Sequence, residues 1–393
     1  MKKIIMSLIL FLCVFACPAL AGVWDIELPH PDYDPLWSKV TDLWENHWDG
    51  KNIDEIITAL HELEKKYPDK VETYLWLGRA YYLKGQWKKK DRLDNYKKSE
   101  MYALKAHTID ETNITALKIL VDTLPNYADK QYLMTHYGEW VKKVTPLPIG
   151  RALPELEPSD EWIKAMKNWD QRGDIEKGKA AVEIFKQIAD KNPANGLAQI
   201  WASRSLYYLG EYHTSIGQHK TKAVPYYKEG MTYGERALKI LPYSIPAHYW
   251  LELNLARSVQ YTSLFNKARH FKPLLDHILF CSRENGLYYY CGPTLTLATM
   301  ITNGGWVTEK GMRLTGHTLE MEMNSLDIAE ILYPNYFYIP YGKADILAYL
   351  GRKQEAREVL DRLFARDPDA NKFNAPDNRC TLRLAKELLD EIE

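Results

Sequence analysis

The sequence predicts an all-α fold in which helical hairpins stack into a superhelix, or α-solenoid. Apolar residues recur at helical spacing through most of the 393 residues, and no segment shows the alternation typical of a half-buried strand. Small residues, turn glycines and terminating prolines recur with these segments, as closely crossing helices require. Because one hairpin cannot bury its apolar stripe alone, further hairpins are expected on either side of it.

The clearest hairpin spans residues 335–370 and matches the tetratricopeptide (TPR) pattern. Ala344 and Ala356 are the small residues where the two helices cross, Gly351 allows the turn, and Pro368 ends the second helix. The large positions of the pattern hold Leu347, Leu360 and Leu363. The fold class predicted is therefore a tetratricopeptide-like helical-hairpin superhelix.

The first 21 residues have the pattern of a secretory signal peptide. Lys2 and Lys3 precede an apolar run over 4–16, and small residues precede a cleavage site after Ala21. This pattern predicts a periplasmic or secreted protein. The alternative is a lipoprotein anchored through Cys17, which follows a poor lipobox.

Prolines divide the remaining chain. We expect N-terminal TPR-like repeats over 22–144, a Pro-rich kink or linker over 145–159, and a C-terminal TPR superhelix with a capping helix over 160–393. Long insertions are expected after Gly85 and after Gly210. The predicted helices are 36–49, 53–67, 74–85, 96–109, 114–124, 129–144, 161–171, 177–191, 197–209, 223–241, 247–265, 271–283, 288–301, 308–333 and 381–393.

Charge and aromatic content limit the class of partner. Lys and Arg number 51 and Asp and Glu 52, so removal of Lys2 and Lys3 with the leader leaves 49 basic against 52 acidic residues. A net charge of −3 is not the basic footprint that nucleic-acid binding requires, so no nucleic-acid partner is expected. The 27 tyrosines and 12 tryptophans are expected to fill the core, with an excess available to line a groove.

Three cysteines remain after leader removal: Cys281, Cys291 and Cys380. Cys281 and Cys291 flank a predicted turn in a protein expected in an oxidising compartment, so they are a candidate disulfide. The alternative is a pair of buried thiols.

The sequence motifs that would indicate phosphate or metal binding are incomplete. The segment 173–180 has phosphate-loop spacing but ends in Ala180, where a Ser or Thr hydroxyl is required. The segment beginning at Asp367 lacks the turn glycine of a calcium loop, and the histidines have no paired metal spacing. We therefore expect no cofactor, no metal and no enzymatic activity.

Tyr288, Tyr289 and Tyr290 precede Cys-Gly-Pro at a helix start. Three consecutive tyrosines point in three directions on a helix, so we expect a rim of hydroxylated rings on the concave face. With Tyr207 and Tyr208 they form the candidate partner or ligand surface. The alternative is a hydrophobic staple at a helix entry.

The segment 287–370 resembles the TPR component of tripartite ATP-independent periplasmic (TRAP) transporters, the T-component. The matching features are Tyr-Tyr-Tyr-Cys-Gly-Pro at 288–293, Tyr-Pro-Asn-Tyr at 333–336 and Tyr-Leu-Gly-Arg-Lys-Gln-Glu-Ala at 349–356. The resemblance implies a periplasmic helical protein that partners a solute-binding protein and has a pore or cavity through its superhelix.

Two functions follow from these observations. The leading hypothesis is a periplasmic TPR scaffold that mediates protein–protein interaction as an accessory component of TRAP-type solute uptake. The alternative is a direct carrier of a small hydrophobic ligand in a cavity through the superhelix. Membrane contact is expected only if Cys17 is lipidated.

Overall fold

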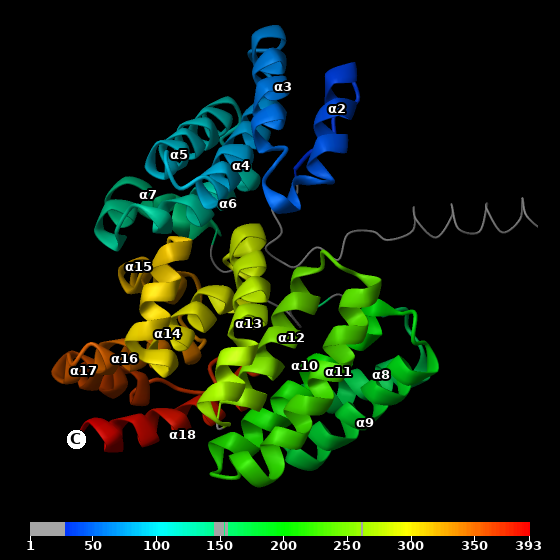
Figure 1. The fold of residues 1–393 in the computed structure, drawn as a ribbon, viewed down its shortest axis with the longest axis vertical. Coiled ribbons are helices and arrows are strands. Elements are labelled where there is room, and N and C mark those ends of the chain that lie inside the picture. The colour runs from blue at the N-terminus through cyan, green and yellow to red at the C-terminus, as the bar shows by residue number, and fades with distance from the viewer. Residues whose placement is uncertain (1–27, 145–152, 154–155, 261) are drawn as a thin grey trace, which may run out of the picture.

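The computed structural model describes residues 28–144, 153, 156–260 and 262–393, and all regular structure within them is helical (Figure 1). The all-α prediction is confirmed. The leader with Ala21 and Cys17, and most of the predicted 145–159 linker, lie outside the described residues. The helices are α2 (Pro35–Trp44), α3 (Ile53–Lys66), α4 (Val71–Trp87), α5 (Arg92–Ile109), α6 (Ile114–Thr123), α7 (Lys130–Val144), α8 (Asp160–Asp170), α9 (Ile175–Lys191), α10 (Gly196–Ser215), α11 (Val224–Ile240), α12 (Ile245–Val259), α13 (Leu264–Asn285), α14 (Tyr288–Thr315), α15 (Leu319–Leu332), α16 (Tyr338–Tyr349), α17 (Lys353–Phe364) and α18 (Ala375–Ile392), with short turns η1 (His47–Asp49), η2 (Leu124–Asn126) and η3 (His219–Ala223).

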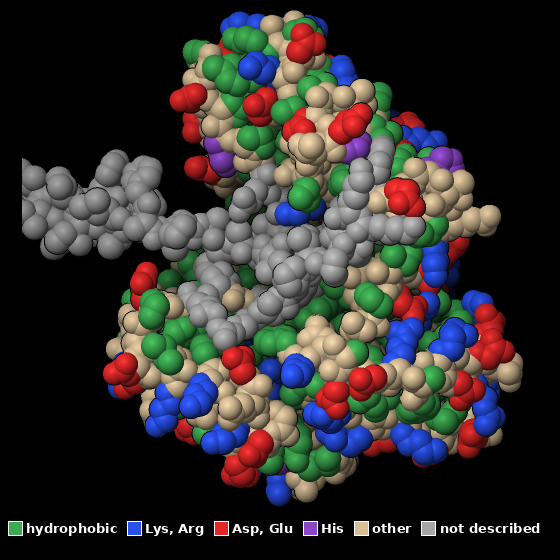
Figure 2. All heavy atoms as spheres, turned by 180° about the vertical axis from the view of Figure 1, so that it is seen from behind, with side chains coloured by type: hydrophobic (Ala, Val, Ile, Leu, Met, Phe, Trp, Pro, Cys, Tyr) green, Lys and Arg blue, Asp and Glu red, His purple; other side chains and the backbone are tan. Residues whose placement is uncertain are grey.

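Consecutive helices pack as hairpins, with the most extensive contacts between α4 and α5, α10 and α11, and α11 and α12. Glycine permits the closest approaches. A Cβ added at Gly210 would lie 2.2 Å from the ring of Tyr227, and one at Gly85 would lie 2.5 Å from the ring of Tyr96. Both tyrosines are buried, so their rings fill the space that the missing Cβ leaves. Basic and acidic side chains are interspersed over the face seen in Figure 2.

The two predicted insertions are shorter than expected, because α4 and α10 extend into them and leave 88–91 and 216–223 between the α-helices. Helix α4 continues to Trp87 and α5 already begins at Arg92. The Trp87 ring is held by the Arg283 guanidinium, whose centre lies 4.0 Å from the ring centroid. Helix α10 likewise continues to Ser215, and Tyr227 donates a hydrogen bond of 2.6 Å to Glu211 in that extension. Contacts from neighbouring helices thus extend α4 and α10 into part of each predicted loop.

Two predicted breaks between helices, at 302–307 and between 265 and 271, are also wrong. The predicted break at 302–307 lies within α14, which ends at Gly316 with φ +94, a left-handed conformation that glycine adopts readily. Helix α13 begins at Leu264 and continues through Pro273, where separate helices ending at 265 and beginning at 271 were expected. The Ser263 side chain caps its start by accepting a hydrogen bond from the Asn266 N–H.

The N-terminal hairpins pack against the C-terminal end of α13. The guanidinium of Arg79 donates to Asp122 at 2.6 Å, to the Arg283 carbonyl at 3.2 Å and to the Glu284 carbonyl. The last carbonyls of a helix have no partner within it, so Arg79 satisfies groups that would otherwise be buried unpaired. The N-terminal repeats are thereby joined to the C-terminal superhelix.

A pair of histidines, His248 of α12 and His277 of α13, predicts that the stability of the fold depends on pH. His248 donates through Nε2 to the Pro242 carbonyl at 2.9 Å, so its neutral Nδ1 accepts from Nδ1 of His277 at 2.8 Å. Burial lowers the pKa of His248 to about 4, and it also lowers the pKa of His277, which Asp276 partly opposes. Between about pH 6.5 and 4 the unfolded chain therefore binds more protons than the folded chain, and stability falls as the pH falls.

The variant His248→Asn isolates this contribution. We expect the loss of unfolding free energy between pH 6.5 and 4.5, measured by urea denaturation, to be smaller in the variant by about 1–3 kcal/mol. The matched control is His136→Asn on the exposed face of α7, which should retain the wild-type slope. Equal slopes in wild type and His248→Asn would contradict the prediction.

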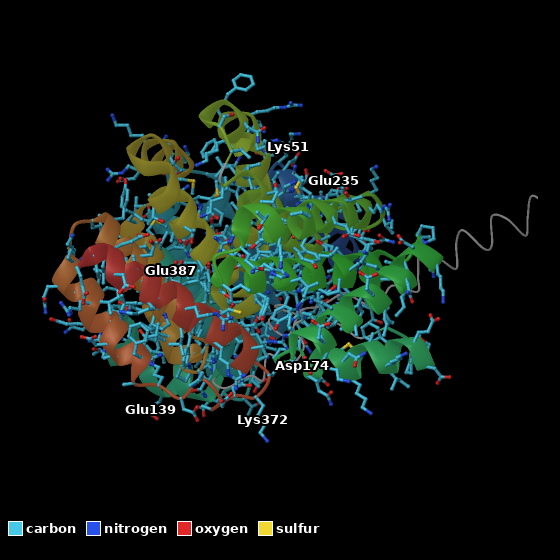
Figure 3. The ribbon with its side chains drawn as sticks, turned by 90° about the horizontal axis from the view of Figure 1, so that it is seen from below. Lys51, Glu139, Asp174, Glu235, Lys372 and Glu387 are labelled. Carbon is cyan, nitrogen blue, oxygen red and sulfur yellow. The ribbon has the colours of Figure 1, made fainter. Side chains whose placement is uncertain are left out.

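Helix α18 closes the C-terminal superhelix on itself. It packs against both α10 and α16, and Figure 3 shows this red helix, labelled at Glu387, crossing the body. The buried Arg172, just after α8, donates to Asp377 at 2.6 Å and to the Phe373 carbonyl at 2.7 Å. Arg383 of α18 donates to Ser215 at the end of α10 at 2.9 Å. The helices α8–α18 therefore surround an interior space.

Candidate functional site

A cavity of about 610 Å³ lies inside the closed superhelix. Its wall comes from α8, α10, α12, α13, α14, α16 and α18, and from the segment before α16. Nine aromatic side chains line it: Trp169, Tyr207, Tyr208, Tyr249, Trp250, Phe271, Tyr289, Tyr336 and Tyr338. The volume lies within the range of about 300–1,000 Å³ typical of small-molecule sites.

Helical periodicity presents these side chains to the cavity. Arg204, Tyr207, Tyr208 and Glu211 of α10 follow the i, i+3, i+4, i+7 spacing, so they lie on one face of that helix. Five lining residues of α12 follow the same rule: Tyr249, Trp250, Leu253, Ala256 and Arg257. Val259 of α12 and its C-cap residue Gln260 also line the cavity. Two long helices thus contribute much of the wall from adjacent positions.

A strained turn brings one further tyrosine into the cavity. Tyr289, Tyr290 and Cys291 have φ values of 44, 60 and 59, and each such left-handed residue costs roughly 1–2 kcal/mol. The turn directs Tyr289 into the cavity, with its ring edge-on to Trp250 at 4.8 Å. A Cβ at Gly292 would lie 2.1 Å from the hydroxyl of Tyr249, so any larger residue there would require the Tyr249 ring to move. Of the Tyr-Tyr-Tyr-Cys-Gly-Pro motif, Tyr289 is therefore the residue that lines the cavity.

Arg204 places a positive charge among the rings. Its guanidinium centre lies 5.0 Å from the Trp201 centroid and 5.3 Å from those of Trp169 and Trp250, within cation–π range. The centroid of the Tyr289 ring also lies 5.4 Å from the guanidinium centre. These cation–π contacts stabilise the positive charge of Arg204, which is buried and also lines the cavity.

Three further charged residues of the wall, Glu211, Arg257 and Asp377, belong to ion pairs. Arg257 binds both oxygens of Glu211, each at 2.8 Å, and its guanidinium also lies 3.2 Å from the hydroxyl of Tyr338. Asp377 accepts from Arg172 at 2.6 Å. Burial raises the pKa of Tyr338 to about 12 and the pKa of Tyr207 well above its usual value, so these hydroxyls are protonated at neutral pH. The cavity wall is mostly apolar, and its hydrogen-bond donors include protonated hydroxyls, guanidinium groups and the ammonium group of Lys267.

The structure brings three of the five predicted surface tyrosines together at this cavity: Tyr207, Tyr208 and Tyr289. It does not bring Tyr288 and Tyr290 there, since they are 2% and 4% exposed within the core. Tyr290 stacks on Tyr336 at 4.0 Å and donates to Asn374 at 2.7 Å. The expectation of an exposed rim of three rings is therefore wrong for two of them.

Sequence reasoning missed Arg204 and the lining residues of α12, although the chain carries a signal for Arg204. The pattern Trp-x-Gly/Ser-Arg-x-x-Tyr-x-x-Gly occurs twice with identical spacing, at 76–85 in α4 and at 201–210 in α10. Arg79 and Arg204 occupy the same position in the two copies. In the first copy the arginine binds a carboxylate and helix-end carbonyls, whereas in the second it lines the cavity.

The predicted Cys281–Cys291 disulfide is not formed, and both residues are buried free thiols. Sγ of Cys281 points toward the Ile245 carbonyl of α12 at 3.6 Å, whereas Cys291 lines a separate small polar pocket beside Asp122. The two side chains therefore serve different packing contacts. Burial raises the pKa of the Cys281 thiol well above its usual value.

Comparison with known proteins gives no family. No family model and no curated protein matches the chain. Among solved structures, the chain is similar to yeast Tom70, with 13% identity, 91% of this chain and 83% of that chain covered, and a TM-score of 0.24. It is also similar to the TPR domain of P58(IPK), with 13% identity, 90% and 98% covered, and a TM-score of 0.20.

At these TM-scores the structural similarity to Tom70 and P58(IPK) supports no inference about this chain. The fold class therefore rests on the helices and hairpin contacts described above. Membership of the TRAP T-component family is not shown. Within the described ranges, no group of three or more His, Cys, Asp and Glu residues is arranged to hold a metal ion. No described helix combines the length and apolar character needed to cross a bilayer.

Proposed function

We propose that this protein is a binding protein that holds one small, mostly apolar ligand with an anionic end in its aromatic cavity. The observation that carries the proposal is the cavity itself, about 610 Å³ in volume and lined by nine aromatic side chains. It is large enough for a drug-sized molecule, and such cavities are the usual binding sites of small apolar ligands. The proposal includes no catalytic step.

The donors in the wall favour an anionic group on the ligand. The lining carboxylates Glu211 and Asp377 already accept from Arg257 and Arg172. Arg204 adds a guanidinium, whose several N–H donors suit a carboxylate or sulfonate. Aliphatic side chains line another part of the cavity, around Val259, Leu274 and Met300. An amphiphile matches both parts.

Two fluorescent probes that share one ring skeleton test the proposal: 8-anilino-1-naphthalenesulfonate, which is anionic, and N-phenyl-1-naphthylamine, which lacks the sulfonate. We expect both to bind the wild type. Arg204→Leu should weaken the anionic probe about 10- to 100-fold, because a charge-assisted hydrogen bond is lost, and should change the neutral probe little. Failure of both probes to bind, with no small molecule retained in native mass spectrometry of host-purified protein, would overturn the proposal.

The second candidate function is a periplasmic scaffold for a protein partner within TRAP-type solute uptake. It is supported by the Tyr-Tyr-Tyr-Cys-Gly-Pro motif, which carries the family resemblance and contributes Tyr289 to the cavity wall. A pull-down of the tagged protein from its native envelope tests it. Recovery of a periplasmic solute-binding protein would support the transporter role, and its absence would count against it.

Export to the periplasm is part of this second proposal. The intact mass of the protein purified from its host distinguishes cleavage after Ala21 from lipidation at Cys17. An uncleaved chain would contradict both forms of export signal.

A further inference from the structure

The first turns of α13 carry the most exposed large apolar side chain of the described residues. Phe265 is 81% exposed, whereas the next such side chain, Ile163, is 57% exposed. Figure 3 shows the yellow-green α13 projecting from one edge of the body. The Phe265 ring at the end of this helix leaves apolar surface in water that contact with a partner would bury.

The side chains around Phe265 are basic. Lys267, Arg269 and Lys272 are all exposed, and no acidic residue occurs in α13 before Asp276. Asp276 forms an ion pair with Lys272 one turn further on. An aromatic tip with flanking cations is the composition of helices that lie in the interface of an anionic bilayer.

The same turns form part of the cavity wall. Lys267, Ala268 and Phe271 line the cavity, whereas Phe265 and Arg269 lie on the solvent side of this helix end. A surface that covers Phe265 would therefore lie directly beside the wall of the cavity. No other described helix combines such an exposed aromatic ring with cavity-lining residues in adjacent turns.

We propose that the N-terminal turns of α13 dock on an anionic lipid bilayer, with Phe265 in the interface and Arg269 and Lys272 against lipid headgroups, so that the cavity takes its ligand from the membrane. This inference rests on the proposed binding function. Charge complementarity identifies the occupant. A single protruding ring among cations suits a bilayer better than a protein partner, since a stable protein interface needs a broad complementary patch of about 800 Å² per side.

Vesicle flotation tests the docking, with protein exported by its own host and Cys17→Ser in every variant so that no acyl chain can anchor it. We expect binding to phosphatidylglycerol-rich vesicles and little binding to pure phosphatidylcholine vesicles. Phe265→Ser should weaken binding about ten-fold, and Arg269→Glu with Lys272→Glu should weaken it by at least about ten-fold. None of these three side chains lines the cavity.

Matched controls lie elsewhere on the surface. Phe364→Ser changes an exposed phenylalanine of α17, and Lys164→Glu with Lys167→Glu reverses two exposed charges of α8. Both should bind vesicles like the wild type. Docking is overturned if the wild type fails to bind anionic vesicles, binds both vesicle types equally, or loses binding equally in the controls. It is also overturned if Phe265→Ser and Arg269→Glu with Lys272→Glu retain vesicle binding but lose binding to an acidic protein partner.

The two naphthalene probes separate the two proposals. Probe binding in solution with no vesicle binding would overturn membrane docking alone. Vesicle binding that depends on Phe265, without probe binding, would overturn the ligand cavity and leave the docking surface.

Discussion

Arg79→Met is expected to lower the free energy of unfolding by about 3–5 kcal/mol, the usual cost of removing one partner from a buried ion pair. Asp122 is buried, and burial raises its pKa to about 6 although Arg79 lowers it. Loss of Arg79 leaves this carboxyl without its 2.6 Å partner and leaves the Arg283 and Glu284 carbonyls without a donor. Urea denaturation measures the effect.

Two variants provide controls for this prediction. Arg79→Met with Asp122→Leu removes both charges and should recover a large part of the loss, because no uncompensated charge remains buried. Arg236→Met breaks an exposed ion pair with Asp190 and should cost less than about 1 kcal/mol. If Arg79→Met costs no more than Arg236→Met, the contact between the N-terminal repeats and α13 does not contribute as proposed.

Ala256→Trp is expected to lower the affinity for both naphthalene probes by about 100-fold or more. Ala256 lines the cavity from α12, so an indole at this position occupies the space of the ligand without removing any polar group. Overpacking costs typically 1–3 kcal/mol of stability, which leaves the fold intact. Fluorescence titration measures the affinity and circular dichroism checks the fold.

The control is Ala365→Trp, which adds the same ring at an exposed position after α17. It should bind both probes like the wild type. The two cavity variants are also distinguishable, since Arg204→Leu discriminates between the probes and Ala256→Trp does not. Unchanged affinity in Ala256→Trp would show that the probes bind outside the cavity.

Local sequence determined the helices and many of their ends. Ser159, Asn195 and Ser244 each cap a helix through the side-chain oxygen, and such caps act within three residues of the chain. The Gly351 turn between α16 and α17 also follows from local residues, with φ +75. Periodicity therefore predicted the helical fold class, because its causes lie within one or two turns of each residue.

Tertiary structure alone decided the cavity and the roles of its tyrosines. A helical pattern does not specify which of Tyr288, Tyr289 and Tyr290 lines the cavity, and in the structure only Tyr289 does. Their separation depends on a left-handed turn and on partners such as Asn374, 84 residues away. The ring around the cavity closes where Arg172 meets Asp377, 205 residues away. Hydrophobic periodicity records which side of a helix is buried and not which distant helix covers it, so contacts at such separations appear only in the folded chain.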